Sequence, residues 1–320
     1  MSKKERLRHI YKDGSRTVVE LILSRDVQSE AAPTPIEIDW VTVTHVYFPI
    51  DEKKLGGYRL ASTPLIEAAV NLPNKQRGIH ASRTYEAVKI ALDSLEYPDI
   101  YSIAPQIAKT LLEKHIYSTK AKAAIRASLF DVAKTPVSNI DSIEHFDTVL
   151  KSYAFRVNGS IITRNFIGVR ASGITACPCA KEVIREVYAK ADGGSENGSL
   201  IPTHMQRAYA DLVVETDGRI QLRDLLEILR ESFSSRTVEL LKRLDEAALV
   251  VSAVEKPRFV EDVVRSAANL MVKRFPTVPN SHRIAIKVKS LESIHRHNLQ
   301  SRLRTTFGKI RRQLENNGMA

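Results

Sequence analysis

The stretch Ala171–Glu182, ASGITACPCAKE, joins an apolar, strand-like run to a predicted helix and holds both cysteines of the 320-residue chain. Proline at position 178 is typical of the first residue of a helix, which places Cys177 at the cap and Cys179 in the first turn. The partial positive charge and unpaired N–H groups of a helix N-terminus favour a thiolate, which is a metal ligand or a nucleophile. Most free cysteines are instead small buried hydrophobic residues, and a disulfide between residues two apart is geometrically unfavourable. This stretch alone leaves the structural and functional interpretations equally open.

The composition indicates a globular protein with one large domain or two medium ones, since 43% of its 320 residues are hydrophobic. No apolar run reaches the roughly 18 residues that a membrane span requires. The start, MSKKERLRHIYKDGS, is charged and has no apolar segment behind it, which argues against a secretory signal. Two cysteines in a chain of this length fit a reducing compartment. We therefore expect a cytoplasmic protein.

The formal net charge of +11 indicates an anionic partner, which can be nucleic acid, a membrane surface or a phosphorylated small molecule. Nucleic-acid binding usually combines basic clusters with aromatic residues, whereas aromatic residues make up only 6% here. The charge alone does not choose among these partners, but it is compatible with a polyphosphate ligand.

Hydrophobic periodicity predicts an α+β fold in which the order strands, two helices, strands occurs twice, with helices on one face of antiparallel sheet. The first 34 residues are expected to form a loosely attached arm with a short strand at 17–23. Residues 120–137 fit a strand or a helix equally well. The predicted strands are 36–50, 58–71, 155–162, 165–175, 203–216 and 281–294, and the predicted helices are 83–95 with Ser82 as its cap, 102–115, 178–190, 221–232, 256–275 opened by Pro257, and a basic amphipathic helix within 298–317.

Five short stretches carry residues that chemistry uses. Each has an ordinary explanation as a polar loop histidine, a solvated helix carboxylate or a strand-end residue. Together they offer thiol, imidazole and carboxylate groups, a donor set that suits a borderline divalent ion such as Zn²⁺ or Fe²⁺. Spacing alone does not identify a metal site, because no tight two-cysteine or HExxH motif is present. The stretches are RGIHASR (77–83), CPC (177–179), THMQR (203–207), KRLDE with FVED (242–246 and 259–262) and ESIHRH (292–297).

With these motifs in this order, the sequence resembles the GTP cyclohydrolases of type IB and their archaeal relatives of the methanopterin pathway. The resemblance covers about residues 36–299 and rests on QRGIHASR, GITACPCAKE, THMQRA, LLKRLDE, PRFVEDVVR and LESIHRH. Six ordered motifs are far more specific than any one of them.

The resemblance implies a tunnelling fold, in which two ββααββ modules lie in one chain and subunits assemble into a barrel-like homo-oligomer. A dimer or a tetramer with active sites at subunit interfaces is the implied assembly. The arm would be residues 1–34, the first module 35–150, and the second module, with the metal site and a C-terminal helix, 151–320. GTP is the implied partner, and neither a membrane nor nucleic acid is expected.

Carried over motif by motif, the implied metal ligands are Cys177, His204 and Glu246, with Cys177 also taking part in catalysis. Glu261 is implied to anchor the guanine ring, while His295 and His297 are implied to transfer protons near the metal. The remaining polar and basic groups are implied to contact the substrate phosphates or the subunit interface: Arg77, His80, Arg83, Lys242 and Arg243.

The sequence departs from the family pattern at two places. Leu244 stands where the family usually has proline, just before Glu246. The chain between Cys177 and His204 is longer than in the bacterial enzymes, and the extra segment DGGSENGSLIPT (192–203) resembles the archaeal branch. The resemblance to that branch implies Fe²⁺ as the metal, with Zn²⁺ or Mn²⁺ as alternatives.

The chemistry implied by the resemblance starts with attack of a metal-activated water on C8 of guanine. A histidine protonates the ring nitrogen, the imidazole ring opens, and hydrolysis releases formate. The archaeal branch yields 7,8-dihydroneopterin 2′,3′-cyclic phosphate with pyrophosphate, whereas the bacterial branch yields 7,8-dihydroneopterin triphosphate, the alternative product. A different class of function, a non-catalytic nucleic-acid-binding protein with a structural metal, predicts salt-sensitive binding of RNA or DNA without formate release.

Overall fold

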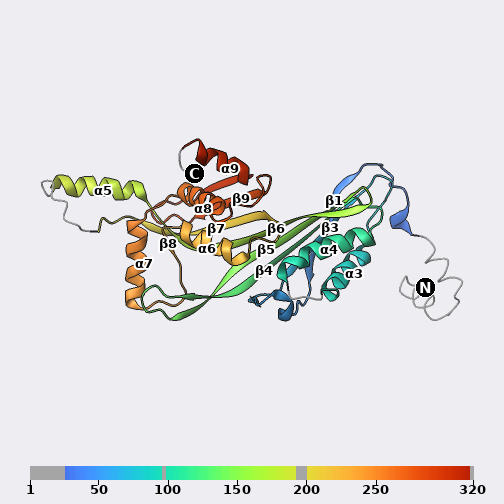
Figure 1. Ribbon diagram of the computed structural model, residues 1–320, viewed down its shortest axis with the longest axis horizontal. Helices are drawn as coiled ribbons and strands as arrows, with labels where there is room; N and C mark the ends of the chain where they lie inside the picture. The colour runs from blue at the N-terminus through green and yellow to red at the C-terminus, as the bar shows by residue number, and fades with distance from the viewer. Residues whose placement is uncertain (1–25, 96–98, 192–199, 318–320) are drawn as a thin grey trace, which may run out of the picture.

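The computed structural model describes residues 26–95, 99–191 and 200–317 and shows an elongated molecule built on one twisted sheet (Figure 1). The predicted strand at 17–23 and most of the insertion at 192–203 lie outside the described residues. The strands are β1 (Ile38–Tyr47), β2 (Arg59–Leu60), β3 (Leu65–Leu72), β4 (Lys120–Lys134), β5 (Asp141–Val157), β6 (Ser160–Ala176), β7 (Met205–Thr216), β8 (Ser235–Arg236), β9 (Arg283–Ser290) and β10 (Leu299–Thr306). The helices are η1 (Val27–Ser29), η2 (Glu52–Leu55), α3 (Ala81–Asp93), α4 (Ile100–Lys114), α5 (Pro178–Ala191), α6 (Leu222–Ser232), α7 (Arg243–Glu255), α8 (Val260–Arg274) and α9 (Phe307–Glu315).

The order of these elements confirms the predicted α+β class and its internal duplication. The first half runs β1, β3, α3, α4, β4, β5, and the second runs β6, β7, α6, α8, β9, β10, with α5, α7 and the short strands β2 and β8 added. In the sheet the strands follow the order β1-β3-β4-β5-β6-β7-β9-β10, and every pair is antiparallel. Among the described helices, none has the length and apolar character needed to cross a membrane.

One face of the sheet carries the hydrophobic core, because alternate residues of each strand point the same way and register with those of the next strand. Leu150 of β5 pairs with Ile125 of β4 and with Ile167 of β6, and all three are buried. Apolar residues of α3, α4, α6 and α8 belong to the same cluster. The core therefore lies between these helices and one side of the sheet.

The β5–β6 hairpin corrects the predicted strand boundaries. Its turn is Asn158-Gly159, whose φ angles of 49° and 79° are typical of the type I′ turns that favour this dipeptide. The predicted strand at 155–162 was wrong because it runs through that turn. Since β5 also continues across the predicted module boundary at residue 150, both halves share one sheet, and the division into domains stays a prediction.

The C-terminal segment is also not the single helix that was predicted. Residues 299–306 alternate in burial and pair along their whole length with β9, so that β10 is the edge strand of the sheet. Only α9 is helical, and it docks through buried Phe307 and Ile310. Residues 120–134, for which the sequence left strand and helix open, form β4.

Helix starts differ slightly from those expected. The first residue of α3 is Ala81, with His80 rather than Ser82 at the cap position, and α8 begins at Val260, after Phe259 and beyond Pro257. Pro178 is the first residue of α5, as predicted. The Cys177 junction thus has the local structure that its sequence indicates.

Candidate active site

The thiol of Cys177 lies at the N-terminus of α5, directly after β6. The backbone N–H of Ala180 donates to Cys177 Sγ at 3.4 Å, and the Thr203 hydroxyl donates to the Cys177 carbonyl at 2.6 Å. This geometry stabilises negative charge on sulfur, because a free N–H of the first helical turn points at it. Cys177 is half-buried, whereas Cys179 is exposed.

His204 lies beside Cys177 because β6 and β7 are neighbours. The Cys177 N–H donates to the His204 carbonyl at 3.1 Å. In the His204 side chain, Nδ1 lies 3.1 Å from Oε1 of the Gln206 side-chain amide. That oxygen only accepts, so Nδ1 carries the proton and Nε2 keeps a lone pair that can bind a metal. Gln206 stands two residues after His204 along the chain, a spacing that places both on one face of an extended segment.

The two predicted proton-transfer histidines lie in the loop between β9 and β10, close to His204. The Leu291 N–H donates to the Arg207 carbonyl at 2.9 Å, which ties this loop to β7. The rings of His295 and His297 stack with centroids 5.0 Å apart, and the ring of His295 stands edge-on to that of His204 at 6.4 Å. The structure therefore gathers three imidazoles at one end of the sheet.

The start of α8 comes to the same end of the sheet. Arg258 forms an isolated antiparallel bridge with Ala176, the residue before Cys177. Its guanidinium donates to the Ser232 carbonyl at 2.7 Å and to the Ser266 hydroxyl at 2.8 Å, which holds the entrance of α8 in place. Glu261 lies three residues farther on, exposed in the first turn of α8. The predicted guanine anchor and the thiol thus share one region.

Close packing supports this end of the sheet. The Phe233 ring lies against Gly173 of β6, where an added Cβ would come within 2.2 Å of the ring. A glycine at this position allows the chain after α6 to lie directly on the strand that leads to Cys177.

The start of α7 holds three other predicted site residues, which are Glu246, Lys242 and Arg243. The contact between α5 and α7 is made by Lys181, whose ammonium donates to the Val254 carbonyl at 2.7 Å. Val254 is near the C-terminal end of α7, and Glu246 precedes it by eight residues, or about 12 Å along the helix axis at 1.5 Å per residue. Lys242 and Arg243 lie at the same distant end and are exposed. The described residues include no group of three His, Cys, Asp or Glu side chains able to hold a metal ion.

The residue that fixes the start of α7 is Asp245, to which the sequence analysis gave no role. Its fully buried carboxylate accepts from the N–H groups of Val137 and Ser138 at 2.8 and 2.9 Å and from the Ser138 hydroxyl at 2.6 Å. It also accepts from the Lys242 N–H at 3.0 Å, which satisfies a backbone donor at the N-terminus of α7. Burial acts to raise the pKa of Asp245, but these hydrogen bonds outweigh it and hold the pKa well below its usual range. Leu244, the departure from the family pattern, is exposed and takes no part in this anchor.

The RGIHASR loop lies at the other end of the molecule, where it binds the first described residues. Figure 1 shows α5 and α7 at one end and β1 and α3 at the other. His80 Nε2 lies 2.9 Å from Asp26 Oδ2, and Arg77 pairs with Glu30 at 3.2 Å.

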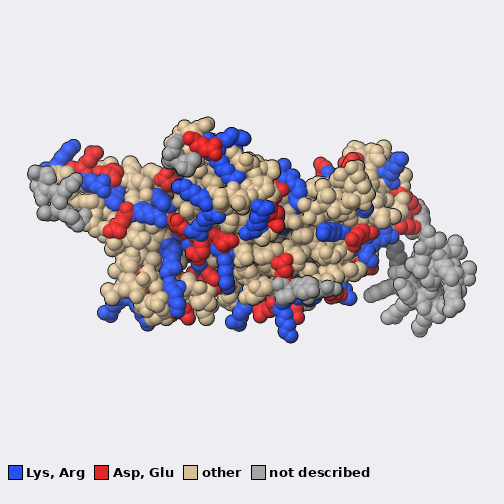
Figure 2. Space-filling view, viewed as in Figure 1, with Lys and Arg blue, Asp and Glu red and all other residues tan. Residues whose placement is uncertain are grey.

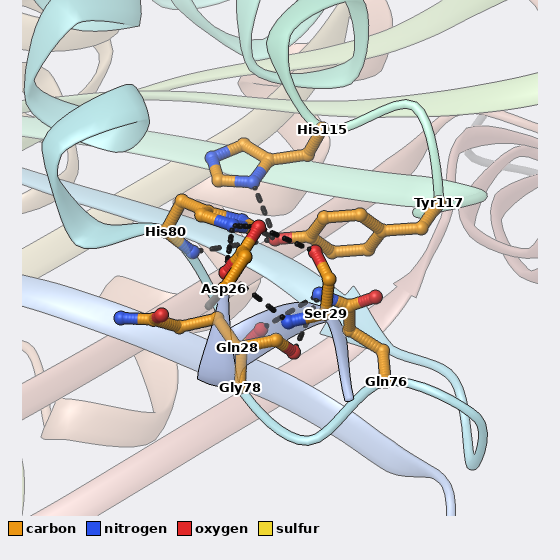
Figure 3. A network of polar contacts seen from close by, with 8 residues as sticks. All are labelled: Asp26, Gln28, Ser29, Gln76, Gly78, His80, His115 and Tyr117. Carbon is orange, nitrogen blue, oxygen red and sulfur yellow. Dashed lines mark hydrogen bonds and ion pairs between the residues drawn. The ribbon is translucent and has the colours of Figure 1, made fainter. Parts of the chain in front are cut away.

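Figure 3 shows how His80, Tyr117 and buried His115 continue this network into the core, with the Tyr117 hydroxyl 2.8 Å from His115 Nδ1. Arg83 is half-buried nearby.

This network has a predicted pH dependence. Hydrogen bonds from His80 and then Ser29 lower the pKa of Asp26 to about 2. The pKa of an unfolded aspartate is about 3.9, so the contact is fully stabilising above that pH and is lost as the pH falls toward 2. Hydrogen exchange at the N–H groups of Arg77 and Gly78, which bond to Glu30 and Gln28, should therefore lose protection in this range.

The matched variants are Asp26→Asn and Asp51→Asn, since Asp51 caps η2 away from this network. Protection of these N–H groups from hydrogen exchange should be low at every pH in Asp26→Asn. In Asp51→Asn it should follow the same pH dependence as in the parent protein. Protection that does not depend on Asp26 would show that the pair does not hold the segment in place.

A thiol at a helix N-terminus, in a residue whose backbone bonds to that of a neighbouring histidine on a duplicated ββααββ sheet, indicates a candidate hydrolytic enzyme. Comparison with protein families identifies which one, because residues 25–301 match the type I GTP cyclohydrolase folE2 family. The chain belongs to this family of type I GTP cyclohydrolases and is an enzyme that acts on GTP.

Curated relatives match almost the full length. GTP cyclohydrolase MptA of Methanothermobacter thermautotrophicus is 31% identical, and the alignment covers 92% of this chain and 97% of that protein. GTP cyclohydrolase MptA 1 of Methanocella arvoryzae is 32% identical with the same coverage. The MptA protein of Methanocaldococcus jannaschii is 31% identical and covers 90% of this chain and 97% of its own length.

Solved structures with a related shape include two uricases. That of Bacillus fastidious has a TM-score of 0.48 at 8% identity and covers 87% of this chain and 94% of its own. That of Arthrobacter globiformis has a TM-score of 0.46 at 6% identity, with coverages of 84% and 93%. Similarity at this level supports no conclusion about the function of this chain.

Proposed function

We propose that this enzyme opens the imidazole ring of GTP, releases formate and forms 7,8-dihydroneopterin 2′,3′-cyclic phosphate. The observation that carries this proposal is the position of Cys177 at a helix N-terminus beside His204, within a chain of the GTP cyclohydrolase family. The choice of the cyclic phosphate over the triphosphate rests on the resemblance to the archaeal branch, and the near full-length similarity to MptA proteins of archaea agrees with that branch.

We also propose that the reaction depends on a divalent metal, Fe²⁺ in the first place, with Zn²⁺ or Mn²⁺ as alternatives. The chemistry of the donors fits such an ion, since Cys177 offers sulfur and His204, whose backbone bonds to that of Cys177, offers an imidazole nitrogen. The metal would supply a Lewis acid that makes hydroxide available near neutral pH. Glu246 is the proposed third ligand, and it would have to approach through a shift of α7 or from a second copy of the chain.

A homo-oligomer, a dimer or a tetramer, is part of the proposal. The RGIHASR loop and Cys177 lie at opposite ends of one chain, so Arg77, His80 and Arg83 can take part in the same site only if they come from a neighbouring copy. The substrate-binding roles of these three residues and of Lys242 and Arg243 remain proposals of this kind.

The chain's own groups have separate roles in the proposed mechanism. Glu261 accepts from N1–H and the exocyclic amine of guanine, which orients C8 toward the thiol region. His295 or His297 donates a proton to the ring nitrogen whose bond to C8 breaks, and general acid catalysis of this type contributes about 10²–10⁴-fold. The two rings stack, so both imidazoles lie in the same place, and either can be the donor.

Gln206 is predicted to hold the His204 ring in its metal-binding tautomer. Gln206→Ala should weaken metal binding by about 10–100-fold, as loss of such supporting contacts does, while Gln206→Glu keeps an acceptor and should restore most of the affinity. Competition with a chelator measures the affinity, with exposed Gln300→Ala as the matched control. Equal affinities in all three variants would show that Gln206 does not orient the histidine.

The proposed product is tested by anaerobic incubation of the protein with GTP and Fe²⁺, followed by mass analysis. We expect a cyclic phosphate of dihydroneopterin together with pyrophosphate and formate. Dihydroneopterin triphosphate as the main product would reject the proposed subtype and leave the family assignment intact. Parallel reactions with Zn²⁺, Mn²⁺ or no metal test the choice of ion.

A further inference from the structure

The face of the sheet opposite the helices holds a trough of about 790 Å³, lined by residues of β1, β4, β5, β6, β7, β9 and β10. Side chains on this face alternate with the core residues of the same strands. Tyr153 pairs with Lys122 on one side and with Arg164 on the other, and none of these three belongs to the core. The volume lies in the range of about 300–1,000 Å³ that small-molecule sites occupy.

Three aromatic rings cross the trough in a row. Trp40 and Tyr153 have centroids 6.1 Å apart with ring planes at 60°, and Tyr153 and Phe166 have centroids 5.9 Å apart at 84°. All three rings are half-buried, so part of each remains open to the trough. Edge-to-face contacts hold the rings in place and leave room for a planar heterocycle to stack.

Cationic groups surround these rings. Lys120 Nζ lies 5.3 Å from the centre of the Trp40 ring, and Arg304 lines the same trough. Lys151 and Arg304 form no ion pair with any carboxylate in the described ranges of the chain. Burial, followed by the charges of Lys122 and Arg126, lowers the pKa of Lys151; Glu67 acts in the opposite sense, and Arg304 adds to the lowering. An anion bound here would relieve that repulsion.

The trough is separate from the Cys177 region. Phe166 and Ala176 are ten residues apart on β6, which corresponds to about 33 Å at 3.3 Å per residue. A ligand in the trough therefore cannot touch the thiol or the histidines around it.

We propose that this trough is a second binding site of the enzyme, for a single phosphorylated aromatic heterocycle such as a nucleotide. The ring stacks on Tyr153 and Trp40, and the phosphates contact Lys151 and Arg304.

A mononucleotide fits better than a long strand because acidic groups stand at both sides of the trough. Asp39 pairs with Lys120 at 2.6 Å, and Glu215 pairs with Arg164 at 2.8 Å. On the face of the molecule that Figure 2 shows, acidic and basic side chains are interspersed.

Trp40 provides the measurement, because it is the only tryptophan in the sequence. Tryptophan emission of the full chain is titrated with ATP, which the proposed guanine site should reject, and with inorganic tripolyphosphate as a competitor without a ring. We expect ATP to quench the emission and tripolyphosphate to reverse the quenching.

Lys151→Met should weaken ATP binding by about tenfold or more, as loss of a charge-assisted hydrogen bond does. Arg304→Gln is the second variant, and Lys109→Met, an exposed lysine on α4, is the matched control.

Three results would overturn the proposal. The first is no quenching at millimolar ATP, as expected if another copy of the chain covers the trough. The second is the same ATP affinity in Lys151→Met, Arg304→Gln and Lys109→Met. The third is an affinity for oligothymidylate that rises with its length, which would assign the trough to a nucleic-acid strand.

Discussion

Replacement of Cys177 by alanine is expected to remove the bound metal and to lower formate release from GTP by about 10³-fold or more. The proposed site loses its thiolate, the donor that the α5 N-terminus stabilises through the Ala180 N–H. A Lewis acid contributes several kcal/mol to the stabilisation of the transition state, and each 1.4 kcal/mol corresponds to about tenfold in rate. Metal content, measured per chain, should fall from one ion to none.

Cys179→Ala is the matched control, since this cysteine is exposed in the first turn of the same helix. Its metal content and turnover should stay close to those of the parent protein. A Cys177→Ala protein that keeps a full complement of metal would show that the ligand assignment is wrong.

Replacement of Glu261 by glutamine should lower kcat/KM for GTP by about two to three orders of magnitude. Guanine presents two adjacent donors, N1–H and the exocyclic amine, and an ionised carboxylate accepts both in short, charge-assisted hydrogen bonds. Glutamine keeps the shape but turns one acceptor into a donor that faces a donor, which leaves polar groups unsatisfied. The metal content should stay normal.

The same carboxylate should exclude ATP by about four orders of magnitude in kcat/KM, because adenine offers an acceptor at the first position and no amine at the second. In one chain Glu261 is exposed, so this selectivity requires substrate or a second copy to exclude water from the site. Glu255→Gln, at an exposed position at the end of α7, is the control. A metal-loaded Glu261→Gln enzyme with unchanged kcat/KM for GTP would exclude the guanine anchor.

Much of the fold follows from local sequence signals. Alternation predicted β1, β7 and β9, helical periodicity predicted α4 and α6, and Pro178 marked the start of α5 correctly. Two predictions of secondary structure were wrong, one because a turn signal within the segment was not used and the other because pairing with a distant strand decided the structure. Asn158-Gly159 is a clear type I′ turn signal within the predicted strand at 155–162. Residues 299–306 form a strand because β9 offers a free edge, which local periodicity does not reveal.

The candidate site was predictable in part. The structure brings Cys177, His204 and the two loop histidines to one end of the sheet and places the start of α8 beside them. It keeps Glu246 about two helical turns from the contact between α5 and α7, a distance that motif order along the chain cannot show. Asp245 was overlooked because its partners, Val137 and Ser138, are more than 100 residues away in sequence.

The most direct test of the central claim follows the carbon that the enzyme should remove. Incubation of the metal-loaded protein with GTP labelled with ¹³C at C8, monitored by NMR, should show the label leaving the purine and appearing as formate. We predict one labelled formate for each GTP consumed, and none from ATP labelled at the same carbon. Consumption of GTP with the label retained in the purine ring, or no consumption at all, would contradict the assignment of this chain as a GTP cyclohydrolase.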